Sequence, residues 1–154
     1  YTDLLFHRVI QNFMIQGGDP FSKNAQPGEK LGSADIGNVI DAEIGAPHLR
    51  GAVAAARTAN VKKASSATQF YIVTGKKLTP EDLLRAEVSK NIKYNDVQKQ
   101  LYLEQGGYPY LDMEYTVFGE VISGMEVVDK ISRLEKDERD RPLNDVRMRI
   151  KMIK

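Results

Sequence analysis

The sequence predicts a small, mostly β domain that carries one helical segment. Short stretches rich in β-branched and aromatic residues recur along the chain, separated by turns that contain glycine, asparagine or proline. The plainest case runs from Val146 to Met152, where apolar and charged residues alternate as in a strand with one buried face. Helix signals concentrate in residues 79–105. A chain of 154 residues can form one domain with its own hydrophobic core.

Expected strands, in chain order, cover residues 1–15, 40–44, 51–57, 69–74, 116–122 and 146–153. The first of these regions is followed by a turn signal at Gly17–Pro20. Residues 21–38 and 58–68 are polar and are expected to form loops, as is the charged run 136–141. Antiparallel strands in this number usually close into a barrel or pack as a sandwich, which removes exposed sheet edges.

The helical segment has its own start and stop signals. Thr79 is a favourable N-cap, Pro80 suits the first helical position, and two acidic residues follow in the first turn. A second helix is expected over residues 95–105, where Gly106 and Gly107 end it. A third, short helix is expected over residues 125–133.

Composition excludes several function classes. The formal net charge is +1, which gives no reason to expect a nucleic-acid partner, and no apolar run is long enough to span a bilayer. Cysteine is absent, so disulfides and thiolate catalysis are excluded. His7 and His48 lack metal-ligand spacing, so we expect neither a metal nor another cofactor. No signal peptide is visible, and the compartment stays open between cytoplasm and periplasm or cell envelope.

Two adjacent segments, FHRVI at Phe6–Ile10 and FMIQGGDP at Phe13–Pro20, resemble the signature of the cyclophilins. Further resemblances follow in the family's order at residues 51–57, 66–72, 111–119 and 124–131. Several separated motifs in the right order are far more specific than any single one. The resemblance covers nearly the whole chain except residues 75–109. It implies one cyclophilin-like domain over residues 1–154, a closed antiparallel β-barrel with capping helices, and a helical insertion at about 79–105.

The family's activity is rotation about the peptide bond that precedes proline, and the resemblance implies which residues serve it. The catalytic residues would be Arg8, Phe13 and Gln16. The substrate-binding residues would be Met14, Ala56, Arg57, Gln69, Tyr71, Tyr110, Leu111 and Tyr115. The partners would be proline-containing peptides or unfolded protein segments.

Position by position, the resemblance divides the groove into parts. The proline pocket would be lined by Phe13, Met14, Tyr71 and Leu111. Gln16 and Gln69 would bind the substrate backbone, while Ala56 and Arg57 would flank the groove for the preceding side chain. Tyr115 stands where many members have histidine, although bacterial-type members also use tyrosine. Tyr110 stands where many members have tryptophan, so cyclosporin binding is expected to be weak.

These residue types suit the reaction. The amide barrier of about 18–20 kcal/mol comes from resonance, and a catalyst must stabilise a twisted amide whose nitrogen has regained its lone pair. Arginine is a permanently charged donor. A hydrogen bond to a charged group contributes roughly 1.5–3 kcal/mol, or about 10- to 100-fold in rate. Further acceleration requires a pocket that holds the proline ring still.

An alternative function stays open at this point. The chain could be a weakly active cyclophilin-like module that binds proline-containing segments as a chaperone or scaffold. A hydrolase or a sugar-binding barrel is disfavoured, because no Ser-His-Asp set or carboxylate pair is convincingly placed. Taken alone, Arg8 would be an ordinary surface arginine, and the pocket residues would be ordinary core. His7 is expected to pack structurally and His48 to lie in a loop.

Two expectations concern parts of the chain outside the motifs. The segment 79–105 separates the strand with Tyr71 from the segment with Tyr110, so it should lie outside the barrel and near the groove. Its deletion should spare activity on short peptides. Family members begin with two strands and a helix before the segment that matches Phe6–Asp19. We therefore expect the native polypeptide to continue upstream of Tyr1, or another chain to supply strands that close the barrel.

Overall fold

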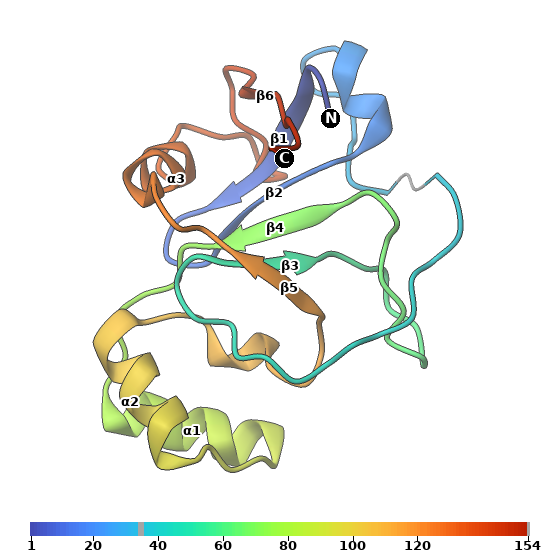
Figure 1. Cartoon of the computed structure of the whole chain (residues 1–154). Coiled ribbons are helices and arrows are strands. Elements are labelled where there is room, and N and C mark those ends of the chain that lie inside the picture. The colour runs from blue at the N-terminus through green and yellow to red at the C-terminus, as the bar shows by residue number, and fades with distance from the viewer. Residues whose placement is uncertain (34–35, 154) are drawn as a thin grey trace.

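The computed structural model describes residues 1–33 and 36–153 (Figure 1). Its strands are β1 (Leu4–Ile10), β2 (Met14–Gly17), β3 (Ala52–Ala55), β4 (Phe70–Val73), β5 (Val117–Glu120) and β6 (Arg147–Met148). Its α-helices are α1 (Pro80–Lys90), α2 (Asp96–Gln105) and α3 (Met125–Ser132). Two short 3₁₀ helices complete the set, η1 (Pro20–Asn24) and η2 (Pro109–Leu111). The loop expected over 21–38 includes residues 34 and 35, which lie outside the described residues.

All six strands belong to one antiparallel sheet, in the order β5-β3-β4-β2-β1-β6. Figure 1 shows β5 and β6 at opposite ends of this sheet. A sheet becomes a barrel only when its two edge strands pair with each other. Within the described residues they do not, so the closed barrel expected from the resemblance is not confirmed.

The C-terminal strand is much shorter than its alternating sequence predicts. Only Arg147 and Met148 belong to β6, which pairs with β1 at Leu4 and Leu5. Beyond them the side chains are exposed, Met152 by 93%. Alternation shows which face a strand would bury, but the strand forms only where a neighbour supplies hydrogen bonds. The strand expected over 40–44 is likewise reduced to a single bridge between residues 40 and 65.

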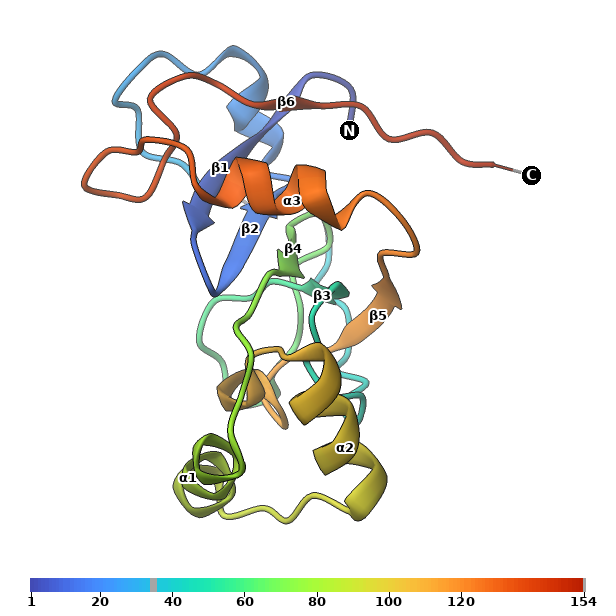
Figure 2. The ribbon, with the colours of Figure 1, turned by 90° about the vertical axis from the view of Figure 1, so that its left-hand side faces the viewer.

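The two faces of the sheet pack against different partners. On one face, Val9 and Ile15 are fully buried against Val128 of α3. Figure 2 shows α3 lying across β1 and β2. The other face carries a second buried cluster, Met14, Ala52, Ala54, Ala56, Tyr71 and Val73. Because alternate residues of a strand point to opposite faces, Tyr71 belongs to this second cluster while its neighbour Ile72 packs beneath α3.

We call α1 and α2 the helix pair. Each starts with a capping box, Thr79 with Asp82 and Asn95 with Gln98, which satisfies otherwise unpaired backbone N–H groups. Its apolar core is a separate cluster, Leu78, Leu83, Tyr94 and Tyr102. The helix pair lies below the sheet in both Figure 1 and Figure 2, and α1 contacts η2. Since η2 contains Leu111, the helix pair lies beside the predicted groove, as expected.

Candidate active site

A cavity of about 130 Å³ opens on the face of the sheet opposite α3. It is lined by Arg8, Phe13, Met14, Gln16, Ala56, Arg57, Tyr71, Leu111 and Tyr115. Every one of these residues is among the site residues expected from the sequence. They come from β1 to β4 or the ends of these strands, from η2, and from the segment between η2 and β5. The fold therefore brings together groups as far apart in sequence as Arg8 and Tyr115.

Strand register explains how the polar groups converge. Arg8 on β1 pairs with Gln16 on β2, and Gln16 pairs with Tyr71 on β4. Paired residues of antiparallel strands project from the same face, so these three form one row across the sheet. The register of β1 and β2 shifts between Phe6 and Arg8, which is a β-bulge or irregularity at His7. Such irregularities redirect side chains and are common beside active sites.

Arg8 is held loosely and remains accessible. Its side chain is 41% exposed, and its Nε lies 3.7 Å from Oδ2 of Asp140. Its guanidinium carbon lies 5.9 Å from the centroid of the Phe13 ring. The backbone of Asp140 also accepts a hydrogen bond from Val9 N–H at 2.8 Å, so the loop 136–141 lies alongside β1 where β6 has ended. The arginine is therefore a charged donor in an open cavity.

Gln69 lies beside the main cavity rather than in it. It lines an adjoining cavity of about 50 Å³, together with Gln16, Ala56 and Arg57. Gln16 donates a hydrogen bond from Nε2 to Oε1 of Gln69 at 3.1 Å, and Gln69 donates to the carbonyl of Gly32 at 3.3 Å. The two glutamines, both expected to bind substrate backbone, are thus joined to each other at the boundary of two cavities.

Tyr110 does not line either cavity. Its side chain is 42% exposed, and its ring packs edge-on against Tyr108 at a centroid separation of 5.9 Å. Tyr108 in turn lies 4.4 Å from the ring of Phe13. Tyr110 is thus connected to Phe13 of the cavity wall through Tyr108.

Sequence reasoning missed the buried network behind the cavity. His48 lies outside the strands, as expected, but its side chain is fully buried and contacts the hydroxyl of Tyr71 at 3.0 Å through Nε2. Its Nδ1 lies 2.8 Å from Oδ1 of Asp112. The other carboxylate oxygen of Asp112 accepts hydrogen bonds from Tyr102 at 2.6 Å and from Tyr94 at 2.7 Å. The network thus connects the cavity wall to the helix pair.

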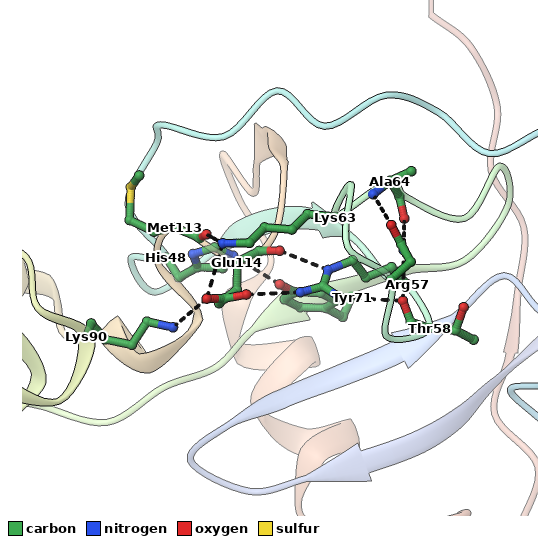
Figure 3. Close-up of polar contacts among 10 residues, drawn as sticks. His48, Arg57, Thr58, Lys63, Ala64, Tyr71, Lys90, Met113 and Glu114 are labelled. Carbon is green, nitrogen blue, oxygen red and sulfur yellow. Dashed lines mark hydrogen bonds and ion pairs between the residues drawn. The ribbon is translucent and has the colours of Figure 1, made fainter.

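A group of charges on the rim is centred on Glu114 and joins Arg57, a site residue expected from the sequence, to two lysines (Figure 3). Oε2 of Glu114 accepts a hydrogen bond from Nη2 of Arg57 at 3.0 Å. Oε1 lies 3.1 Å from the ammonium of Lys90 and 3.3 Å from that of Lys63. Hydrogen bonding by Lys90 is the main reason that the pKa of Glu114 lies below its ordinary value, with Lys63 adding to it. Glu114 therefore bears a negative charge between three cations.

Arg57 is fixed on several sides. Its Nε donates to the carbonyl of Glu114 at 3.0 Å, and its guanidinium carbon lies 4.7 Å from the centroid of the Tyr115 ring. Its side chain is only 11% exposed. A stacked arginine with charge-assisted hydrogen bonds has little rotational freedom. Arg57 therefore forms a rigid wall between the two cavities, both of which it lines.

His7 packs structurally, as expected. Its side chain is buried, and burial lowers its pKa from 6.5 to about 4, although the nearby charge of Asp19 opposes the shift. Neither ring nitrogen has a hydrogen-bond partner among the described residues. The imidazole is therefore neutral at pH 7 and lies beneath the backbone that presents Arg8.

The cavity combines apolar side chains with two charged donors, Arg8 and Arg57, and the amide of Gln16. The described residues contain no cluster of three His, Asp or Glu side chains placed to hold a metal ion. Over the same residues, no helix is long and apolar enough to cross a membrane. An arrangement of this kind can orient a ring and polarise an amide without forming a covalent bond.

Comparison with known proteins agrees with the resemblance to cyclophilins that the sequence motifs show. The sequence pattern of the family described as "Cyclophilin type peptidyl-prolyl cis-trans isomerase/CLD" matches residues 1–152. The chain therefore belongs to the cyclophilin-type peptidyl-prolyl cis–trans isomerases, and its function is that of this enzyme family.

Relatives and solved structures point the same way. A protein of Staphylococcus haemolyticus with a provisional peptidyl-prolyl cis–trans isomerase name is 32% identical over 146 residues, which are 95% of this chain and 69% of that protein. A similarly named protein of Staphylococcus aureus strain USA300 is 34% identical over 148 residues, 95% of this chain and 70% of that protein. A crystal structure of a Cryptosporidium parvum cyclophilin, determined in the presence of the dipeptide Ala-Pro, matches with a TM-score of 0.61 at 22% identity. The match covers 96% of this chain and 72% of that one, and shows a shared fold.

Proposed function

We propose that this isomerase holds the proline ring of its substrate in the 130 Å³ cavity and that Arg8 is the catalytic residue. The observation that carries the proposal is the convergence of Arg8 with Phe13, Gln16 and their neighbours around one small cavity. Proline-containing peptides and flexible protein segments are the proposed substrates. A cavity of this size suits a single ring rather than an extended ligand, since sites for drug-sized molecules are typically about 300–1,000 Å³.

The proposed roles follow from the geometry. The rings of Phe13 and Tyr115 and the side chain of Leu111 hold the proline ring by apolar contact. The charged N–H groups of Arg8 stabilise the lone pair that the amide nitrogen regains as the bond twists. Gln16, paired with Arg8 across β1 and β2, binds the substrate carbonyl or N–H next to the rotating bond. No covalent intermediate is required, because the reaction is a rotation.

Replacement of Arg8 tests this proposal. Arg8→Ala should lower kcat/KM for a tetrapeptide with an Xaa-Pro bond by at least tenfold, the equivalent of about 1.4 kcal/mol. The fold should survive, because the side chain is 41% exposed. Arg149→Ala is the matched control, since Arg149 is an exposed arginine whose Nη2 lies 3.8 Å from Oδ1 of Asp3. Near-normal activity of Arg8→Ala would overturn the mechanism. Tight peptide binding with little turnover by the unaltered protein would instead favour the binding-module alternative.

We further propose that the sheet closes into the family's barrel through additional strand pairing at its open edges. Phe118 on the edge strand β5 is 63% exposed and, with Tyr1 and Phe70, lines a cavity of about 520 Å³. Exposed strand edges beside apolar surface are costly and attract further strands. Hydrogen exchange of the β5 amides measures this pairing. Because β5 already pairs with β3, which binds only alternate amides, closure should slow exchange at every residue of Val117–Glu120. Fast exchange at the amides that β3 does not bind would contradict closure.

A further inference from the structure

The rim of the site carries more positive than negative charge. Three cations, Arg57, Lys63 and Lys90, surround the single carboxylate of Glu114, which leaves two positive charges in excess. These cations come from three separate parts of the chain, the end of β3, the loop that follows it, and α1 of the helix pair. Figure 3 shows Lys90 reaching Glu114 from one side and Arg57 from the other.

Among the described residues, no acidic group other than Glu114 forms an ion pair with these three cations. Asp112 is buried and turned inward, where His48 and two tyrosines bind it. Asp140 lies at the other end of the groove, beside Arg8. The rim cations remain partly accessible, with 37% of the Lys63 side chain and 17% of the Lys90 side chain exposed.

The charged rim adjoins the place where a substrate would lie. Arg57 lines both the proline-sized cavity and the adjoining cavity beside Gln69, so it forms the wall between them. If the proline ring occupies the first cavity, as proposed above, a neighbouring side chain of the substrate must pass this wall. The resemblance assigns that position to the residue that precedes proline.

We call Glu114 and its three cationic partners the Glu114 cluster. We propose that this cluster selects substrates with an acidic residue immediately before proline, and that Lys90 makes the helix pair a specificity element of the site. This inference rests on the proposed location of the proline pocket. Lys90 contributes in two ways, as one of the excess positive charges and as a partner that holds Glu114 against Arg57. A carboxylate on the substrate gains the attraction of the rim, whereas an amide of the same shape does not.

Three peptides that differ only in the residue before proline, Glu, Gln or Lys, provide the test. At an ionic strength of about 10 mM, where charges interact over about 30 Å, kcat/KM for the Glu peptide should exceed that for the Gln peptide by about two- to fivefold. The Lys peptide should be the poorest. At about 1 M salt, where screening acts within about 3 Å, the preference should disappear. The effect should appear in KM, because the attraction acts on bound substrate throughout the reaction.

Variants of the helix pair separate charge selection from a structural role. Lys90→Met should at least halve the Glu-to-Gln ratio of kcat/KM, while Lys90→Arg should preserve it. Lys99→Met is the matched control, because Lys99 also belongs to the helix pair but pairs with Glu87 at 3.1 Å, and it should leave the ratio unchanged. Since each ratio is measured within one protein sample, partial unfolding cancels.

Two results would overturn the inference. One is equal kcat/KM for the Glu and Gln peptides in the unaltered protein at low salt. The other is an unchanged ratio in Lys90→Met. Either result leaves the proposed function intact as long as the Gln peptide is isomerised in an Arg8-dependent manner. Failure to isomerise any of the three peptides would instead overturn the proposed site together with this inference.

Discussion

The hydroxyl of Tyr102 offers a sharp test of how the helix pair is joined to the site. Tyr102 is fully buried, and its hydroxyl donates a 2.6 Å hydrogen bond to the carboxylate of Asp112. Burial, followed by the charge of Asp112, raises the pKa of Tyr102 far above its ordinary value, so the group stays a donor. Tyr102→Phe removes this donor and keeps the ring, which preserves the apolar packing against Leu83 and Tyr94.

The expected loss in the free energy of unfolding follows from the burial and charge of the acceptor, Asp112. A hydrogen bond to a charged group contributes about 1.5–3 kcal/mol. Asp112 keeps the hydroxyl of Tyr94, the backbone N–H of His48 and Nδ1 of His48 as partners, so its charge is not left unpaired. We therefore expect Tyr102→Phe to lower the free energy of unfolding by about 2 kcal/mol, or to lower Tm by about 4–8 °C for a domain of this size.

Urea unfolding at pH 7 measures this change, and the m-value should stay constant. Tyr110→Phe is the control, because Tyr110 is 42% exposed and should change stability by less than about 0.5 kcal/mol. A loss for Tyr102→Phe that is no larger than the loss for the control would refute the idea that Asp112 anchors the helix pair. The structure also revises the expected effect of deleting residues 79–105. Such a deletion would remove both tyrosine donors from buried Asp112, so the point variant is the cleaner experiment.

Three further predictions concern the proposed role of Arg8, the buried His7 and the exposed Tyr110. Asp140→Asn should lower kcat/KM about two- to fivefold, because it releases the Nε of Arg8. Asp3→Asn is the control and should leave kcat/KM unchanged, since Asp3 also has a φ of 64° and pairs with an arginine. Equal effects of the two substitutions would contradict a positioning role for Asp140. The pKa of His7 is about 4 in the folded chain and 6.5 in the unfolded chain, so the unfolded chain binds the proton more tightly. The free energy of unfolding should therefore fall by about 3 kcal/mol as the pH drops from above 6.5 to 4. His7→Gln should flatten that part of a urea-midpoint profile, and an unchanged profile would show that His7 is not the titrating group. Cyclosporin should bind only weakly, because tyrosine at position 110 offers less area than an indole and no ring N–H. Calorimetry should show Tyr110→Trp tightening the binding, and nanomolar affinity of the unaltered protein would disprove the prediction.

Local sequence determined the elements whose stabilising groups lie close together in the chain. Thr79, Pro80 and Asp82 mark the start of α1, and the capping box forms between residues three apart. The same holds for α2, which ends before Gly106. The segments Phe6–Ile10 and Phe13–Pro20 contain three catalytic candidates, two on adjacent strands and Phe13 in the turn between them, so their motif resemblance was enough to identify one wall of the cavity.

Only the tertiary structure decided which of the other predicted strands form and which polar groups contact each other. The alternation from Val146 to Met152 predicts a long strand, yet pairing with β1 ends after Met148, because a strand depends on a neighbour that its own sequence does not specify. The contact between His48 and Asp112 spans 64 positions of the chain. The contact between Lys90 and Glu114 joins a helix to a loop 24 positions away. Contacts of this kind leave no periodic signal in the sequence, since they arise only when separate elements pack side by side.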